Sequence, residues 1–141
     1  MKKVIVMTLI FVFIFSFTAL VYAKPIDYKF ITINEYQKVA DQSTLIDVRS
    51  INSRNKSKLV IPGEVWINPY SGPELAKFIA ASDKDKPYTV FCSCVDDNYS
   101  IRTAQLLAKN GFKNVNVLKD GWDSIVKSGL PTVPLREGEN Q

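Results

Sequence analysis

The chain has 141 residues, a formal net charge of +4 at pH 7, two cysteines and no histidine. This length suits one ordinary domain, and the lack of histidine excludes Ser-His and Cys-His triads as well as histidine-containing metal sites. Lysine and arginine are scattered among aspartate and glutamate, a pattern typical of a solvated surface, so we expect no nucleic-acid partner.

The first 23 residues have the layout of a bacterial signal peptide. Lys2 and Lys3 precede an almost continuously apolar stretch over residues 4–21, and Val21 and Ala23 are suitably placed before a cleavage site. We therefore expect export to the periplasm or cell surface of a bacterium. The alternative is an uncleaved N-terminal anchor, because the apolar stretch approaches the ~20 residues that span a bilayer. We expect membrane contact only in that second case.

Strands and helices are expected to alternate over residues 28–135, ahead of a polar tail at 136–141. The expected strands are residues 30–31, 45–48, 65–67, 88–91 and 115–118. Helices are expected at 33–40 after a Thr32–Glu35 capping box, after Ser71, after an N-cap at Ser100, and around Trp122. Residues 50–58 are expected to be irregular. The alternation predicts an α/β fold with a parallel central sheet of about five strands and helices on both faces.

Both cysteines lie where an expected strand turns into an expected helix, in the segment Phe91-Cys92-Ser93-Cys94. A helix N-terminus presents unpaired N–H groups and partial positive charge, which stabilise a thiolate and attract anions. A disulfide between residues two apart closes a very small loop and adds little stability, so reactive or redox chemistry is favoured over a structural bond. Two cysteines alone do not complete a metal site, and we expect no metal and no cofactor.

Several motifs occur together in a specific order. They are Leu45-Ile46-Asp47-Val48-Arg49, Ile61-Pro62-Gly63 with Val65-Trp66-Ile67-Asn68-Pro69, Val90-Phe91-Cys92, Ser100-Ile101-Arg102-Thr103-Ala104 with Gly111-Phe112, and Leu118-Lys119-Asp120-Gly121-Trp122 with Gly129-Leu130-Pro131. This series resembles the single-domain rhodanese (sulfurtransferase) family. The resemblance implies a three-layer rhodanese-like fold. It also implies a loop cysteine that takes sulfane sulfur from a donor, holds it as a persulfide and passes it to a thiol acceptor.

The resemblance leaves two candidates for the nucleophile. Counting forward along the strand gives Cys92, whereas counting back from Ser100 by the usual loop length of the family gives Cys94. We favour Cys92, because strand pairing sets register more firmly than loop length does. The resemblance further implies a substrate-binding set that consists of Arg49, Ser93, Val95, Asp96, Asp97, Asn98, Tyr99, Ser100 and Arg102.

The loop departs from the pattern of the family. Tyr99 stands where many members have arginine, and Asp96 and Asp97 place negative charge beside the thiol. This charge raises a thiol pKa and repels thiosulfate, so we expect a neutral or protein-borne persulfide as donor. Two alternatives remain open: a catalytically inactive rhodanese-like binding module, and a Cys-x-Cys thiol–disulfide redox protein.

Overall fold

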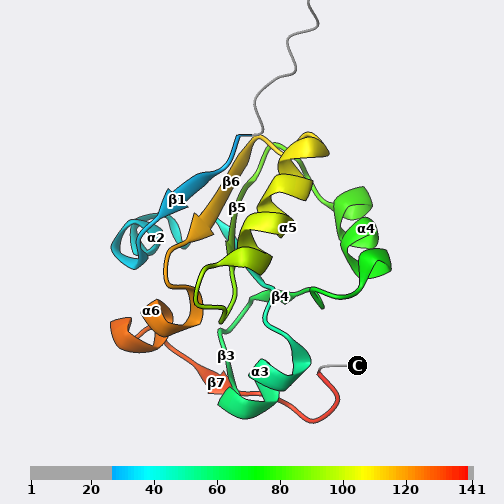
Figure 1. Ribbon diagram of the computed structural model, residues 1–141. Coiled ribbons are helices and arrows are strands. Elements are labelled where there is room, and N and C mark those ends of the chain that lie inside the picture. Colours follow the sequence, from blue (N-terminus) through cyan, green and yellow to red (C-terminus); the bar gives the residue numbers. More distant parts are fainter. Residues whose placement is uncertain (1–26, 140–141) are drawn as a thin grey trace, which may run out of the picture.

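The computed structural model describes residues 27–139 (Figure 1). The expected leader at residues 1–23 lies outside the described residues. The described residues form a central sheet of five parallel strands in the order β1-β6-β5-β2-β4. Its members are β1 (Lys29–Ile31), β2 (Thr44–Asp47), β4 (Val65–Trp66), β5 (Pro87–Phe91) and β6 (Asn114–Leu118). The predicted α/β fold is confirmed, and β5 is its middle strand.

Helices connect the strands and cover the sheet. They are α2 (Ile33–Val39), α3 (Ile51–Ser57), α4 (Gly72–Ala81), α5 (Asn98–Lys109) and α6 (Gly121–Ser128). The capping box of α2 is present as predicted, because the Thr32 hydroxyl accepts from the Glu35 amide while the Glu35 carboxylate accepts from the Thr32 amide. Figure 1 shows α4 and α5 on one side of the sheet and α2 on the other.

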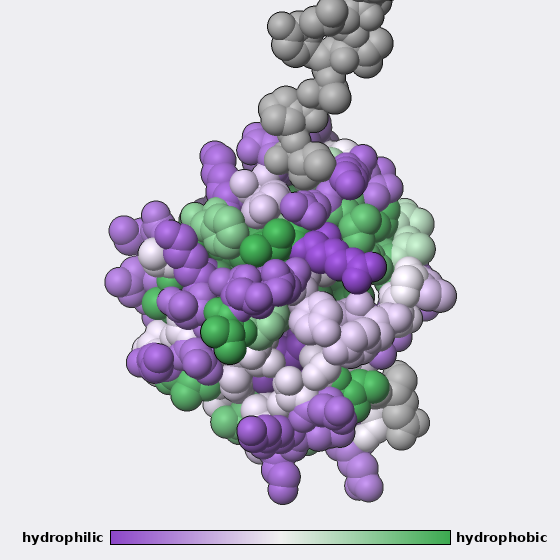
Figure 2. Space-filling model, viewed as in Figure 1, coloured by the Kyte–Doolittle hydropathy of each residue, from purple (hydrophilic) through white to green (hydrophobic). Residues whose placement is uncertain are grey.

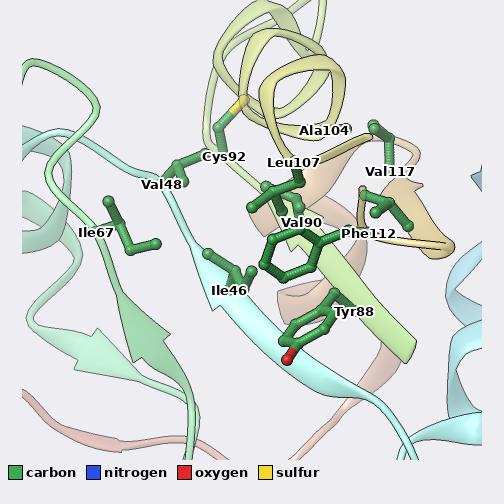
Figure 3. Close-up of a cluster of buried hydrophobic side chains, with 11 residues drawn as sticks. Ile46, Val48, Ile67, Tyr88, Val90, Cys92, Ala104, Leu107, Phe112 and Val117 are labelled. Carbon is green, nitrogen blue, oxygen red and sulfur yellow. The ribbon is translucent and has the colours of Figure 1, made fainter. Parts of the chain in front are cut away.

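Alternation along the strands builds two separate cores. Successive strand residues point to opposite faces, so the inner strands β2, β5 and β6 contribute to both. One core, drawn in Figure 3, joins residues of the sheet to the inner face of α5 at Ala104 and Leu107. The other core joins the sheet to α2 and α6 and consists of Tyr36, Leu45, Phe91, Leu118, Trp122 and Ile125. These two cores make the three layers that the sequence predicts.

Two features differ from expectation. Residues 50–58 are not irregular but form α3, which begins at an N-cap serine, Ser50, whose hydroxyl accepts from the Ser53 amide at 3.2 Å. A second, antiparallel pair also forms from β3 (Leu59–Val60) and β7 (Val133–Pro134).

The face shown in Figure 2 is largely hydrophilic, with hydrophobic areas between. None of the helices within residues 27–139 has the length and apolar character needed to cross a membrane.

Candidate active site

The cysteine loop lies at the carboxyl edge of the sheet. Cys92 directly follows the last residue of β5, and α5 begins at Asn98. Figure 3 places Cys92 at one end of the apolar cluster, beside Val48 and far from Tyr88. The carboxyl edge of a parallel sheet is where ligands bind in open α/β folds. The loop therefore has the position expected of an active site.

The two cysteines form a disulfide across Ser93, with their Cα atoms 5.6 Å apart. Their surroundings differ. Cys92 is 0% exposed, whereas Cys94 is half-buried and packs against the edge of the core. The Cys94 amide also donates a hydrogen bond to the Cys92 sulfur at 3.4 Å. Cys92 is thus enclosed by the protein, whereas Cys94 is partly accessible.

Helix α6 fixes the backbone of Cys92. The Trp122 amide donates to the Cys92 carbonyl at 2.7 Å. Gly121 makes this close approach possible, since a Cβ atom at that position would lie 2.0 Å from the Cys92 carbonyl oxygen. Gly121 lies in the Leu118–Trp122 motif, but its sequence position alone predicts no role in the site.

The far end of the loop is held by Asp97. Its backbone is left-handed with φ +53° and forms the N-cap of α5. Its amide donates to the Cys94 carbonyl at 3.4 Å, and its carboxylate accepts from the Asp120 amide at 3.3 Å. Burial raises the pKa of the Asp97 carboxyl, although the bond from Asp120 opposes the change. Asp97 therefore ties the cysteine loop to the turn before α6.

The expected N-cap at Ser100 is wrong. The left-handed turn at Asp97 starts α5 earlier, so that Ser100 lies in its first turn. Ser100 is fully buried there, and its hydroxyl has no hydrogen-bond partner among the described residues. A buried hydroxyl without a partner is unusual, and this one lies at the start of the helix that follows the cysteines.

The other predicted loop residues lie on the surface around the disulfide. Ser93 and Asp96 are exposed, Val95 is 103% exposed at the tip of the loop, and the Asn98 amide group donates to the Asp96 carboxylate. The structure thus brings the predicted residues 92–100 together in one continuous loop and first helical turn.

A cleft of about 250 Å³ lies against the first two turns of α5. Its lining includes Ile67, Tyr70, Leu75, Tyr99, Arg102 and Leu106. The hydroxyls of Tyr70 and Tyr99 are 2.5 Å apart, and this hydrogen bond raises the pKa of the Tyr99 hydroxyl. Arg102 is exposed beside them. Tyr70 was not predicted, because it comes from the segment before α4, far from the cysteines in sequence.

Arg49 is not part of this loop. Its side chain is 0% exposed, pairs with Asp47 at 2.8 Å and stacks 3.7 Å from the Trp122 ring. Arg54 of α3 also pairs with Asp47 and, at 2.5 Å, with Glu64. We call these four residues (Asp47, Arg49, Arg54 and Glu64) the buried charge cluster. The Arg49 side chain therefore packs against Trp122 in the core that joins the sheet to α2 and α6, and it does not face the cysteines.

Glu64 makes the buried charge cluster sensitive to pH. Burial and the nearby Asp47 carboxylate raise the pKa of Glu64 to about 7, and Arg54 only partly opposes them. The folded state then binds a proton more tightly than the unfolded state does. We expect the free energy of unfolding to fall as pH rises from about 5 to about 8. In Glu64→Gln, the contribution of Glu64 to this fall should be absent. Urea unfolding of wild type and Glu64→Gln at several pH values measures this. If the free energy of unfolding depends on pH equally in both proteins, Glu64 is not the cause.

Within the part of the chain that the structure describes, no group of three or more histidine, cysteine, aspartate or glutamate residues is arranged to hold a metal ion. The loop presents its two cysteine sulfurs, its backbone amides and neighbouring hydroxyl and carboxylate groups.

Comparison with known proteins agrees with this geometry. The family model described as Rhodanese-like domain matches residues 32–128. A polysulfide-sulfur transferase homodimer from Wolinella succinogenes is similar, with 23% identity, a TM-score of 0.60, and coverage of 79% of this chain and 82% of that one. A rhodanese-related protein from Thermoplasma volcanium has 24% identity and a TM-score of 0.62, covering 75% of this chain and 98% of that one.

A third similar structure, the Alr3790 protein from Anabaena sp., has 19% identity and a TM-score of 0.62 over 74% of this chain and 82% of that one. The comparison with curated proteins found no match. At these identities the likeness to solved structures shows the fold.

Proposed function

This chain belongs to the rhodanese-like domain family, and we propose that it is a sulfurtransferase that carries sulfane sulfur as a persulfide on Cys94. One observation carries the proposal: Cys94 is the half-buried cysteine of a loop that joins the middle strand β5 to the N-terminus of α5, whereas Cys92 is 0% exposed. A donor has to reach the sulfur that attacks it.

This assignment departs from the preference for Cys92 in the sequence analysis. Strand register does place Cys92 directly after β5, but its side chain is enclosed by the core around Val48 and Val90. The count back from Ser100 already pointed to Cys94. Accessibility and loop length therefore support the same cysteine.

The local backbone suits thiolate chemistry without a histidine base. The first turn of a helix carries N–H groups without intrahelical partners and the positive end of the helix dipole. Here that turn, in α5, follows Cys94 by four residues and contains the buried Ser100 hydroxyl. The helix N-terminus favours ionised sulfur, while the Asp96 and Asp97 carboxylates in the same loop oppose it. The Cys94 thiolate attacks the outer sulfur of a persulfide donor, the donor thiolate leaves, and a thiol acceptor takes the sulfur onward.

Replacing Cys94 tests the proposal directly. The reduced protein is mixed with cysteamine persulfide, and the release of cysteamine thiol is followed. We expect Cys94→Ser to lower the rate to that of buffer, while Lys56→Met, at an exposed position on α3 outside the cysteine loop, stays within about twofold of wild type. A Cys94→Ser protein that is folded and as fast as wild type would overturn the assignment.

Asp96 is expected to select against anionic donors. Its carboxylate is exposed at the tip of the loop, and a charge about 4 Å from a substrate anion is worth about 1 kcal/mol in water. Asp96→Asn should therefore raise kcat/KM for thiosulfate about fivefold and lower it for the cationic cysteamine persulfide, because the same charge that repels an anion attracts a cation. The gain should shrink at high salt. An equal gain with both donors would contradict this role for Asp96.

The disulfide favours a second candidate, a thiol–disulfide redox protein. Such a protein would exchange electrons with dithiols and disulfides and would gain no sulfur atom from cysteamine persulfide. A catalytically inactive binding module would do neither.

The proposed partners are a neutral, cationic or protein-borne persulfide donor and a thiol acceptor. The proposed location is the periplasm or cell surface, which rests on residues outside the described part of the chain.

A further inference from the structure

The two cysteines differ in a way that assigns them separate tasks. Cys94 is half-buried in the loop, and Cys92 is 0% exposed at the end of β5. An external persulfide reaches the first sulfur and not the second. Yet the two sulfurs are bonded to each other, and their Cα atoms are 5.6 Å apart, a usual separation for a disulfide. Cys92 therefore reaches Cys94 without rearrangement of the sheet.

The backbone around Cys92 holds its sulfur in place beside Cys94. The Cys94 amide donates to the Cys92 sulfur at 3.4 Å, and an N–H donor stabilises the charged form of a thiol. The Trp122 amide and the close backbone of Gly121 hold the Cys92 carbonyl. Cys92 is thus fixed in place beside Cys94 and shielded from outside reagents.

We propose that the chain releases its bound sulfur as hydrosulfide through Cys92, an inference that rests on the proposed function of Cys94. The Cys92 thiolate attacks Sγ of the Cys94 persulfide. The Cys92–Cys94 bond forms, the bond from Cys94 Sγ to the outer sulfur breaks, and that sulfur leaves as HS⁻ with the persulfide proton. The outer sulfur gains two electrons, and the two cysteine sulfurs together lose two.

The product of this step is the disulfide seen in the structure. A dithiol reductant, either a small molecule or a protein, reduces it and is itself oxidised to a disulfide, which returns both cysteines to the thiol state. The substrates are therefore a persulfide and a dithiol, and the products are sulfide, a thiol and a disulfide. Attack from within the loop needs no second molecule, so it is faster than transfer to a dilute thiol acceptor.

A single-turnover experiment tests this. The full chain is reduced, freed of reductant and mixed with one equivalent of cysteamine persulfide; sulfide, free thiols and protein mass are then followed. Wild type should release about one sulfide per chain and lose both thiols. Cys92→Ala, a small apolar replacement for a sulfur in an apolar core, should keep an added sulfur on Cys94 and release sulfide at least about tenfold more slowly.

The outcomes separate the two proposals. If wild type and Cys92→Ala both retain a stable persulfide on Cys94, release through Cys92 is overturned and the sulfurtransferase proposal stands. If neither protein takes up sulfur, the sulfurtransferase proposal fails. If Cys92→Ala instead carries cysteamine as a mixed disulfide on Cys94, with sulfide expelled in that step, the protein is a redox protein and both proposals fail. Should Cys92→Ala not fold, Cys92→Ser gives the same comparison of the adduct mass on Cys94.

Discussion

Replacing Gly121 by alanine is expected to disrupt the active-site loop more than any other single-methyl change. The new Cβ would lie 2.0 Å from the Cys92 carbonyl oxygen and 3.0 Å from its carbonyl carbon. Because both atoms are backbone at the end of β5, they cannot swing away as a side chain would. We expect Gly121→Ala to lower the free energy of unfolding by about 3 kcal/mol and to abolish sulfur uptake in the fraction that remains folded.

Gly129, at the other end of α6, is the matched control. It has a positive φ of +73°, but a Cβ there would meet nothing within 4 Å. Gly129→Ala therefore carries only the strain of left-handed backbone, about 1 kcal/mol, and should leave sulfur uptake intact. Urea unfolding and persulfide uptake compare the two variants. Equal losses in both would show that contact with Cys92 is not what requires Gly121.

The second large effect is expected at Arg54 in the buried charge cluster. Its guanidinium pairs with the Asp47 and Glu64 carboxylates, and its side chain is 0% exposed. Arg54→Met leaves Arg49 as the only cation of the cluster beside two buried carboxylates. Removing one partner of a buried ion pair costs about 3–5 kcal/mol, and we expect a loss of that size, measured by urea or thermal unfolding.

Two further proteins show whether charge is the cause. Lys56 lies exposed on the same helix, so Lys56→Met should change stability by less than about 0.5 kcal/mol. The double variant Arg54→Met with Glu64→Gln removes one of the uncompensated carboxylates and should recover part of the loss. A double variant that is as unstable as the sum of its single variants would point to lost packing in α3 and not to charge.

The sheet was predictable because its strands are marked locally. The runs at 45–48, 88–91 and 115–118 are short and mostly apolar, and each contains one pair of neighbours that enter different cores: Leu45 and Ile46, Val90 and Phe91, and Val117 and Leu118. The short strands β3 and β7 carry no such mark. Their pairing joins Val60 to Val133, and two residues on each side give too little pattern to detect.

Helix α3 was missed because it buries a charge in place of an apolar stripe. Its inward residue is Arg54, whose partner Asp47 lies on β2. A usable signal was present in the N-cap residue Ser50. Asp47 and Arg49 give a second signal. Residues two apart on an extended segment lie on the same side of it. This arrangement favours the ion pair that keeps Arg49 away from the cysteine loop.

The site was predictable in position but not in detail. Residues 92–100 lie together because they are continuous in sequence. The start of α5 depends on Asp97, whose carboxylate bonds to Asp120 across the fold. The difference in exposure between Cys92 and Cys94 depends on how the core closes over the end of β5. Both are non-local, and neither follows from spacing along the chain.

Locating the transferred sulfur tests the central claim most directly. Reduced wild type, Cys92→Ala and Cys94→Ser are each treated with cysteamine persulfide, blocked with a thiol alkylating reagent and mapped by peptide mass spectrometry. Our account predicts one added sulfur atom on Cys94 in Cys92→Ala and none in Cys94→Ser. An added sulfur on Cys92 in Cys94→Ser, with no sulfur on Cys94 in Cys92→Ala, would contradict it.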